Sequence, residues 1–134
     1  MKRLLGLSMV VVAAALTTGV TTCVANSSWP SRTTPSSSAI GWFKAINAHD
    51  RGRLLFYVAP DARSQMGWAR RSATWPKFSD LHCRSLKDTS RNRAKLHCTF
   101  VESAAPTAGN PDSFWNISLR KASGLWLIES YGQG

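Results

Sequence analysis

Acidic side chains are scarce in this sequence. Seven aspartates and glutamates stand against seventeen lysines and arginines, and the formal net charge is +10. So few carboxylates leave few candidates for a catalytic acid or base. His49 and Asp50 are adjacent, but neighbouring residues at a helix end point apart, and no other histidine stands at a suitable spacing from an aspartate. We therefore expect no catalytic residue, no cofactor and a non-catalytic protein.

Charge is absent from one stretch near the start of the chain. The run from Leu4 to Leu16 is apolar over about 13 residues and follows Lys2 and Arg3, as in a secretory signal peptide. Small residues stand at the positions that signal peptidase reads before a cut after Ala25. We predict a signal peptide over residues 1–25, with an uncleaved membrane anchor as the alternative. Either reading places the protein outside the cytoplasm, secreted or held at the membrane.

Cysteine is rare as well, with three residues in the chain. Cys23 ends the stretch VTTC, which resembles a bacterial lipobox, although Thr22 stands where Gly, Ala or Ser is usual. Cys23 is therefore a lipidation candidate, and the alternative is that it leaves with the signal peptide. Residues 26–37 are rich in Ser, Thr and Pro and too polar to bury a core. We expect a flexible linker there, followed by a single domain over residues 38–134.

The tripeptide Leu-His-Cys occurs twice, ending at Cys83 and at Cys98. Both copies lie in segments with strand character, where neighbouring side chains point to opposite faces. His82 and Cys83 therefore cannot readily share a metal ion, and we expect no metal site. An antiparallel pairing with Cys83 opposite Cys98 gathers the sulfurs and the apolar residues on one face, and opposed residues are close enough for a bridge. We predict a Cys83–Cys98 disulfide, which suits an oxidising compartment. The same register would place Glu102 opposite Ser79.

The basic residues are scattered, with one local cluster between the two cysteines of this hairpin. Its members are Arg84, Lys87, Arg91, Arg93 and Lys95. Outside the cytoplasm such a surface meets lipid headgroups, cell-wall polymers or acidic proteins. Nucleic acid is the usual partner of this charge, but an exported protein rarely meets it, so we expect no nucleic-acid binding. The alternative is a solvated basic face that only keeps the protein soluble.

Aromatic residues are numerous for so small a domain, and we expect most of them to fill its core. Trp68 and Trp75 flank a basic helix end, and we expect them to be exposed anchors for a partner. On the last strand, Glu129 should share a face with Leu127 and Tyr131. Glu129 and Tyr131 are therefore candidates for binding a ligand or a partner.

Three helices are expected before four strands. The first helix begins at Ser37 or Ser38, which can cap it, and carries an apolar stripe through Trp42 and Ile46. Asp50 should end this helix and cap the next, and a third short helix should start near Asp61. The predicted strands cover residues 78–86, 93–103, 113–121 and 125–134. This order predicts an α+β fold, with the helices packed on one face of a curved four-stranded antiparallel sheet.

Several stretches in this order resemble the nuclear-transport-factor-2-like superfamily, in particular its small exported bacterial members, many of them lipoproteins. They are the segment AIGWFKAINAHD ending at Asp50, the doubled LHC, and a closing pattern of Gly124, Trp126, Ile128 and Gly132. The resemblance covers about residues 39–134. It implies a cone-shaped fold in which a bent sheet wraps helices and leaves a pocket open at one end.

The resemblance also implies two functions, because members of that superfamily include binding or assembly modules as well as isomerases and cyclases. We expect a non-catalytic module at the bacterial cell envelope, bound to an envelope protein or to an anionic surface. The alternative is a small-molecule pocket protein or an isomerase-like enzyme. An open interior with Glu102, Glu129 or Tyr131 pointing into it would favour that alternative. The resemblance leaves a homodimer through the outer sheet face open.

Overall fold

The structure, a computed structural model, describes residues 29–70, 75–87, 89–103 and 113–133. The predicted signal peptide and Cys23 lie outside these residues. The elements in chain order are α1 (Pro35–Asn47), α2 (Arg51–Phe56), the 3-10 helix η1 (Pro60–Arg70), β1 (Lys77–Ser85), β2 (Arg93–Ser103), β3 (Phe114–Ala122) and β4 (Leu125–Gly132). Three helices followed by four strands confirm the predicted α+β fold.

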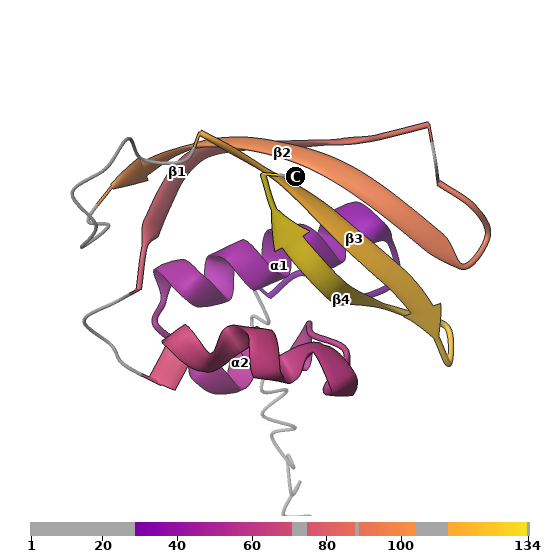
Figure 1. The fold of residues 1–134 in the computed structure, drawn as a ribbon, viewed down its shortest axis with the longest axis horizontal. Coiled ribbons are helices and arrows are strands. Elements are labelled where there is room, and N and C mark those ends of the chain that lie inside the picture. Colours follow the sequence, from indigo (N-terminus) through magenta and orange to yellow (C-terminus); the bar gives the residue numbers. More distant parts are fainter. Residues whose placement is uncertain (1–28, 71–74, 88, 104–112, 134) are drawn as a thin grey trace, which may run out of the picture.

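The four strands form one antiparallel sheet in the order β1-β2-β3-β4. The sheet arches over α1, and all the helices lie on its concave side (Figure 1). We call the opposite, convex side of the sheet its outer face. Among the described helices, none is long and apolar enough to cross a bilayer.

The start of α1 differs from the prediction. Thr34, and not Ser37 or Ser38, is the N-cap: its hydroxyl accepts a hydrogen bond from the Ser37 backbone N–H at 3.1 Å, and the Ser37 side chain closes a capping box. Pro35 takes the first helical position, where its missing N–H costs nothing. Ser38 is fully buried, and its hydroxyl donates to the Trp126 carbonyl at 2.8 Å. The helix thus begins inside the segment predicted to be a linker.

The described part of that segment packs on the domain. The Tyr57 hydroxyl donates to the Pro30 carbonyl at 2.6 Å, and the Trp126 N–H donates to the Arg32 carbonyl at 2.8 Å. Trp29 is half-buried against the hydrophobic core. Residues 29–37 therefore belong to the folded domain, whereas residues 26–28 lie outside the described residues.

The second and third helices follow short connections. Asp50 caps α2 as predicted, with its Oδ1 accepting from the Arg53 N–H at 2.9 Å. The segment after Pro60 is helical, but it is a 3-10 helix kinked at Met66. Val58, between α2 and η1, makes an isolated parallel bridge to Ile128 of β4. This bridge fixes the helical layer to the edge strand of the sheet.

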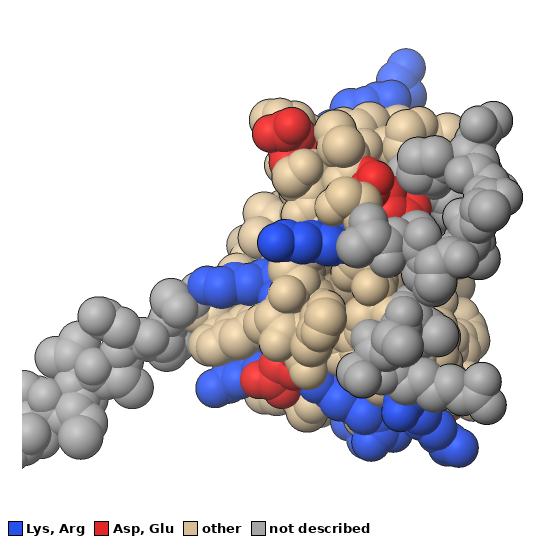
Figure 2. Space-filling model, turned by 90° about the vertical axis from the view of Figure 1, so that its left-hand side faces the viewer, with Lys and Arg blue, Asp and Glu red and all other residues tan. Residues whose placement is uncertain are grey.

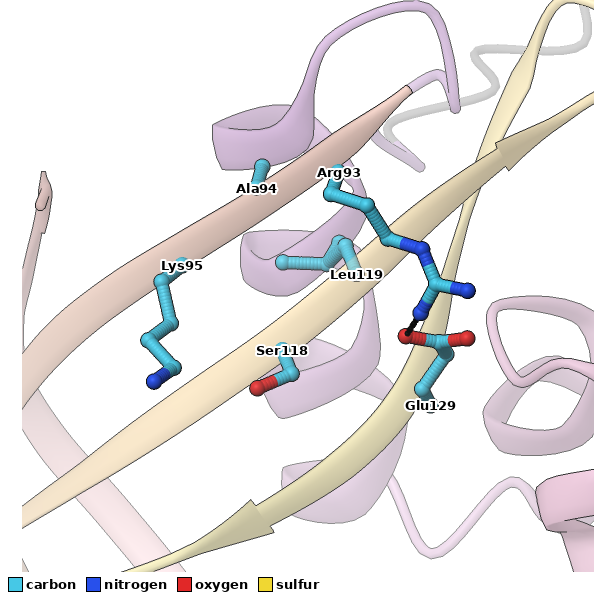
Figure 3. Close-up of a pocket in the computed structure, with 6 residues that line it drawn as sticks. All are labelled: Arg93, Ala94, Lys95, Ser118, Leu119 and Glu129. Carbon is cyan, nitrogen blue, oxygen red and sulfur yellow. Dashed lines mark hydrogen bonds and ion pairs between the residues drawn. The ribbon is translucent and has the colours of Figure 1, made fainter. Parts of the chain in front are cut away.

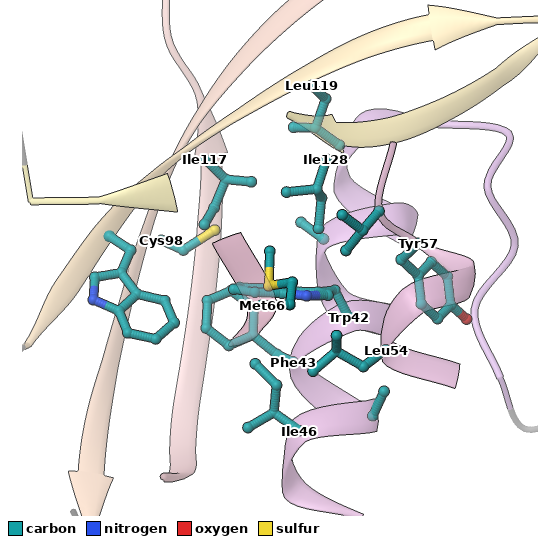
Figure 4. Close-up of a cluster of buried hydrophobic side chains, with 14 of the residues drawn as sticks. Trp42, Phe43, Ile46, Leu54, Tyr57, Met66, Cys98, Ile117, Leu119 and Ile128 are labelled. Carbon is teal, nitrogen blue, oxygen red and sulfur yellow. The ribbon is translucent and has the colours of Figure 1, made fainter. Parts of the chain in front are cut away.

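The core lies between α1 and the concave face of the sheet. Trp42, Phe43 and Ile46 of α1 are buried, which confirms the predicted apolar stripe (Figure 4). Phe43 contacts the rings of Phe78 and Trp115, at centroid distances of 5.1 and 5.8 Å. The larger ring cluster, which we call the aromatic interior, consists of Trp42, Phe43, Phe78, Phe100, Trp115 and Tyr131.

The hairpin of β1 and β2 has the predicted register around the cysteines. Cys83 lies opposite Cys98, and the two form a disulfide. The register shifts between Ser79 and His82, where Asp80 has a φ of 51°. The bulge adds one residue to β1, so the pairing beyond it is shifted by one position. Glu102 therefore lies opposite Phe78 and not opposite Ser79. Phe78 is accordingly buried and Ser79 is exposed.

A second bulge changes the last strand. Leu119 of β3 pairs with Ile128, but the preceding Ser118 pairs with Ser130, so Glu129 is an extra residue on β4. Strand alternation therefore restarts after Glu129, and Tyr131 lies in the aromatic interior beside Trp42. The prediction that Glu129 and Tyr131 share a face is wrong for this reason.

Candidate functional site

Polar and basic side chains gather on the outer face of the sheet. Arg93 and Lys95 of β2 lie beside Ser118 of β3, and Glu129 lies across them on β4 (Figure 3). These residues line a shallow hollow of about 190 Å³. Three neighbouring strands thus place cations and one carboxylate around a single depression.

An ion-pair chain organises one side of this hollow. The Glu129 carboxylate accepts from the guanidinium of Arg93, and its other oxygen lies 3.5 Å from Nη1 of Arg120. Arg120 also binds Asp61 of η1, with an Nη1–Oδ2 distance of 3.0 Å. Arg93 and Arg120 are direct partners in the β2–β3 register, and opposed like charges destabilise a sheet. The two carboxylates offset that repulsion and fasten η1 to the sheet.

The pKa of Asp61 is lowered from its ordinary value of 3.8, chiefly by the hydrogen bond from Arg120. A depressed carboxyl pKa in the folded state contributes stability above the unfolded pKa and loses it as the pH falls through the folded one. We expect Asp61→Asn to lower the free energy of unfolding near pH 6. Below about pH 4 the difference from the wild type should shrink. Urea unfolding across this range measures it, and a difference that grows in acid would contradict the role of the ion pair.

The hairpin cations predicted from the sequence lie on the surface. Arg84, Lys87 and Arg91 are exposed around the turn between β1 and β2. Arg84 lies opposite His97 in the register. These two residues and Cys83 help to line a second hollow of about 120 Å³. We call the exposed cations Arg84, Lys87, Arg91 and Lys95 the basic hairpin. Arg93 belongs to the ion-pair chain instead.

The two tryptophans predicted to be exposed anchors, Trp68 and Trp75, do not lie with the basic hairpin. Trp75 is only 5% exposed, and Trp68 is half-buried against it at a ring distance of 5.5 Å. The Trp68 indole N–H donates to the Tyr131 hydroxyl at 2.7 Å, and burial raises the pKa of Tyr131. Trp75 is therefore a core residue and not an exposed anchor. Trp68 and Tyr131 close one end of the aromatic interior.

Two parts of the site were not predicted. Arg120 and Asp61 hold the ion-pair chain, but they are far apart in sequence and only the packing of η1 on the sheet joins them. Trp29 and Arg32 pack on α1 and α2, although their Ser/Pro-rich surroundings indicated a linker. The sequence held an indication of each. Trp29 is a large aromatic residue in a polar stretch, and Arg120 is a charged residue on the polar face of a strand with alternating polarity.

His, Cys, Asp and Glu side chains form no group of three suited to a metal ion within the described parts of the chain. The Glu129 carboxylate is engaged by the guanidinium groups of Arg93 and Arg120. Around it, the hollow and the basic hairpin carry more cations than carboxylates. The arrangement is suited to contact an anionic group at the surface.

Comparisons with known proteins give a fold and no family. No protein-family model matches the chain, and no curated protein matches it in sequence. Among solved structures, it is similar to a SEC-C motif containing protein from Rhodopseudomonas palustris, known from a solution structure. The sequences are 17% identical, the TM-score is 0.52, and the match covers 78% of this chain and 81% of that one. The likeness is therefore one of α+β fold alone.

Proposed function

We propose that this protein is an exported, non-catalytic binding module of the bacterial cell envelope, and that the basic hairpin contacts an anionic polymer or acidic protein there. The observation that carries the proposal is the division of the molecule into two faces. The concave side of the sheet is filled by the aromatic interior, while the outer face and the turn present Arg84, Lys87, Arg91 and Lys95 to solvent.

The aromatic interior argues against a substrate site at its centre. Trp42 contacts the rings of Phe43, Trp115 and Tyr131, all at centroid distances between 5.1 and 5.8 Å. A ligand pocket of this fold class needs a cavity lined by apolar and a few convergent polar groups, and these rings occupy that space. Glu129 lies on the outer face, so it cannot serve as a base inside.

We further propose that the chain is a distant member of the nuclear-transport-factor-2-like superfamily. The order of elements supports this, as does the sheet that arches over α1. The bridge between Val58 and Ile128 supports it too, since it draws the segment after α2 against the last strand. That superfamily contains both binding modules and enzymes, so the membership is compatible with the function proposed.

Binding to a polyanion tests the function. We expect the protein to bind polyphosphate, a soluble stand-in for a phosphate-rich envelope polymer, and the affinity to fall steeply between about 50 and 200 mM salt because exposed charges are screened. Replacing Arg84 and Arg91 with glutamate should weaken the binding by at least tenfold, since like charges then oppose the polymer. Titration calorimetry or fluorescence anisotropy measures both effects.

The matched control is Arg63→Glu together with Arg70→Glu on η1, which changes the net charge by the same amount at exposed positions away from the turn. This control should weaken binding only slightly. Equal losses in both double variants would show attraction to net charge alone, and binding that ignores salt would refute the proposed contact.

One observation favours the alternative of a small-molecule pocket. The indole Nε1 of Trp42 is buried and has no hydrogen-bond partner among the described residues. A buried donor without an acceptor is costly, and an oxygen of a small molecule admitted by a movement of the surrounding rings would satisfy it. Mass spectrometry of the protein isolated under native conditions tests this, because a retained small molecule would appear as an additional mass.

A further inference from the structure

A second surface lies on the helical side of the molecule, where the described chain begins. We call it the entry face and define it by Trp29, Arg32, Ile40, Lys44, Arg53 and Phe56. It joins the first described residues to the exposed sides of α1 and α2. It shares no residue with the basic hairpin, and it lies on the layer opposite the outer face of the sheet (Figure 1).

Cations and aromatic rings alternate across the entry face. Trp29 lies between α1 and α2, with Lys44 Nζ at 5.1 Å and Arg53 Cζ at 5.3 Å from its ring centroid. The guanidinium of Arg32 stacks over Phe56 at 3.6 Å, and its Nη1 donates to the Phe56 carbonyl at 2.9 Å. These contacts hold three positive groups beside two aromatic rings.

Exposed apolar side chains also belong to the entry face. Among the described residues, three large hydrophobic side chains are exposed: Phe56 (41%), Ile40 (43%) and Val101 (54%). Two of the three, Ile40 and Phe56, belong to the entry face. Ile40 lies one turn before Lys44 on the exposed side of α1, so it borders the cation that contacts Trp29. Trp, Phe and Ile beside Lys and Arg are typical of surfaces that lie in a membrane interface.

Negative charge is sparse beside these groups. Among the described residues, the ion pairs involve Arg93 and Arg120 on the sheet, and none of them includes Arg32 or Arg53. Asp50 is the nearest acid in the sequence, and its Oδ1 accepts from the backbone N–H of Arg53 at the start of α2. Lysine and arginine side chains stand out close to the start of the described chain in Figure 2. The surface is therefore complementary to an anion.

We propose that the entry face docks on the anionic headgroups of the membrane, with Trp29, Ile40 and Phe56 at the interface and Arg32, Lys44 and Arg53 on the phosphates. The proposal rests on the envelope location proposed above. Only residues 24–28 separate Cys23 from Trp29, and the six Cα–Cα steps between these two residues span at most roughly 22 Å. A lipid on Cys23 or an uncleaved leader would therefore keep this face next to the bilayer. Docked in this way, the protein directs the basic hairpin away from the membrane.

Paramagnetic broadening of NMR signals tests the orientation. The full-length chain is reconstituted in nanodiscs of phosphatidylglycerol and phosphatidylcholine that contain a lipid with a gadolinium headgroup. We expect the Trp29 indole signal and the amides of Ile40, Arg53 and Phe56 to broaden, and those of Arg84 and Arg91 to stay sharp. In discs of phosphatidylcholine alone the broadening should decrease, because the headgroups then carry no net charge.

Charge reversal provides the matched comparison. The double variant Lys44→Glu with Arg53→Glu should lose most of the broadening at Ile40 and Phe56, because removing two cations weakens docking roughly 30-fold, while the short link to the leader keeps Trp29 near the disc. The control, Arg84→Glu with Arg91→Glu, should keep it while losing polyphosphate binding. If glutamate disturbs folding, as the dispersion of the amide spectrum would reveal, Lys44→Gln with Arg53→Gln replaces it. Broadening that is uniform, centred on the hairpin, or unchanged in the entry-face variant would overturn the docking proposal and leave the polyphosphate result standing.

Discussion

Replacing Gly41 with alanine is expected to lower the free energy of unfolding by about 1–3 kcal/mol. Glycine in a helix interior normally costs stability relative to alanine, by about 1 kcal/mol, so this substitution would ordinarily be favourable. Here a Cβ at position 41 would overlap the ring and hydroxyl of Tyr57. Tyr57 is fully buried, and its hydroxyl donates to the Pro30 carbonyl, so moving the ring would break this hydrogen bond and disturb the packing around it.

Urea unfolding of the purified protein measures this effect, with Gly52→Ala as the matched control. Position 52 is helical as well, but its nearest contact for a Cβ is Asp50 Oδ1 at an ordinary 3.5 Å. We expect alanine there to be neutral or stabilising by up to about 1 kcal/mol. A double-mutant cycle with Tyr57→Leu isolates the overlap, since the cost of Gly41→Ala should fall when the ring is removed. A stabilised Gly41→Ala variant would show that α1 and Tyr57 do not pack as closely as described.

Removing the disulfide is expected to cost about 3 kcal/mol, the chain-entropy value for a loop of this size. Cys83 and Cys98 are separated by 15 residues and lie directly opposite each other. Alanine at both positions avoids a buried hydroxyl, which matters because Cys98 is fully buried. In a domain with a small core this loss is a large share of the total stability. We expect the double variant to unfold at a clearly lower urea concentration.

The reduced wild type provides the control for this loss. A thiol reductant should destabilise the wild-type protein and leave the Cys83→Ala/Cys98→Ala variant unaffected. Intact-mass measurement of the protein isolated from its own cells adds an independent check, because a formed disulfide lowers the mass by the two thiol hydrogens. The same spectrum reports whether Cys23 carries a lipid or has been removed. Free thiols in the native protein would contradict the disulfide and, with it, the main argument for an oxidising compartment.

The local patterns that rest on periodicity were predictable from the sequence. The stripe through Trp42 and Ile46 requires one buried helix face. The placement of Cys83 opposite Cys98 follows from strand alternation, because a slip by one residue would move both sulfurs and the apolar residues to solvent. Asp50 was identifiable as a cap, since a carboxylate at that position satisfies a free backbone N–H of α2.

Positions that depend on an irregularity were not predictable. The bulge at Asp80 moved Glu102 opposite Phe78, and the extra residue Glu129 turned Tyr131 into the core. Each bulge shifts strand alternation by one residue, so a single unrecognised irregularity reverses every assignment that follows it. The expectation that Trp75 is exposed failed for another reason, because the sequence shows that a ring is large and apolar but not which neighbour covers it.

The sequence by itself determined the order of helices and strands, the paired cysteines and the excess of positive charge, because these depend on residues near one another in the chain or on composition. Only the tertiary structure decided which charges meet. Asp61 reaches Arg120, and Trp29 lies between Lys44 and Arg53, through the packing of separate elements. The candidate surfaces of this protein are made of such long-range contacts, and their geometry is fixed when the helices close on the sheet and bury the core between them.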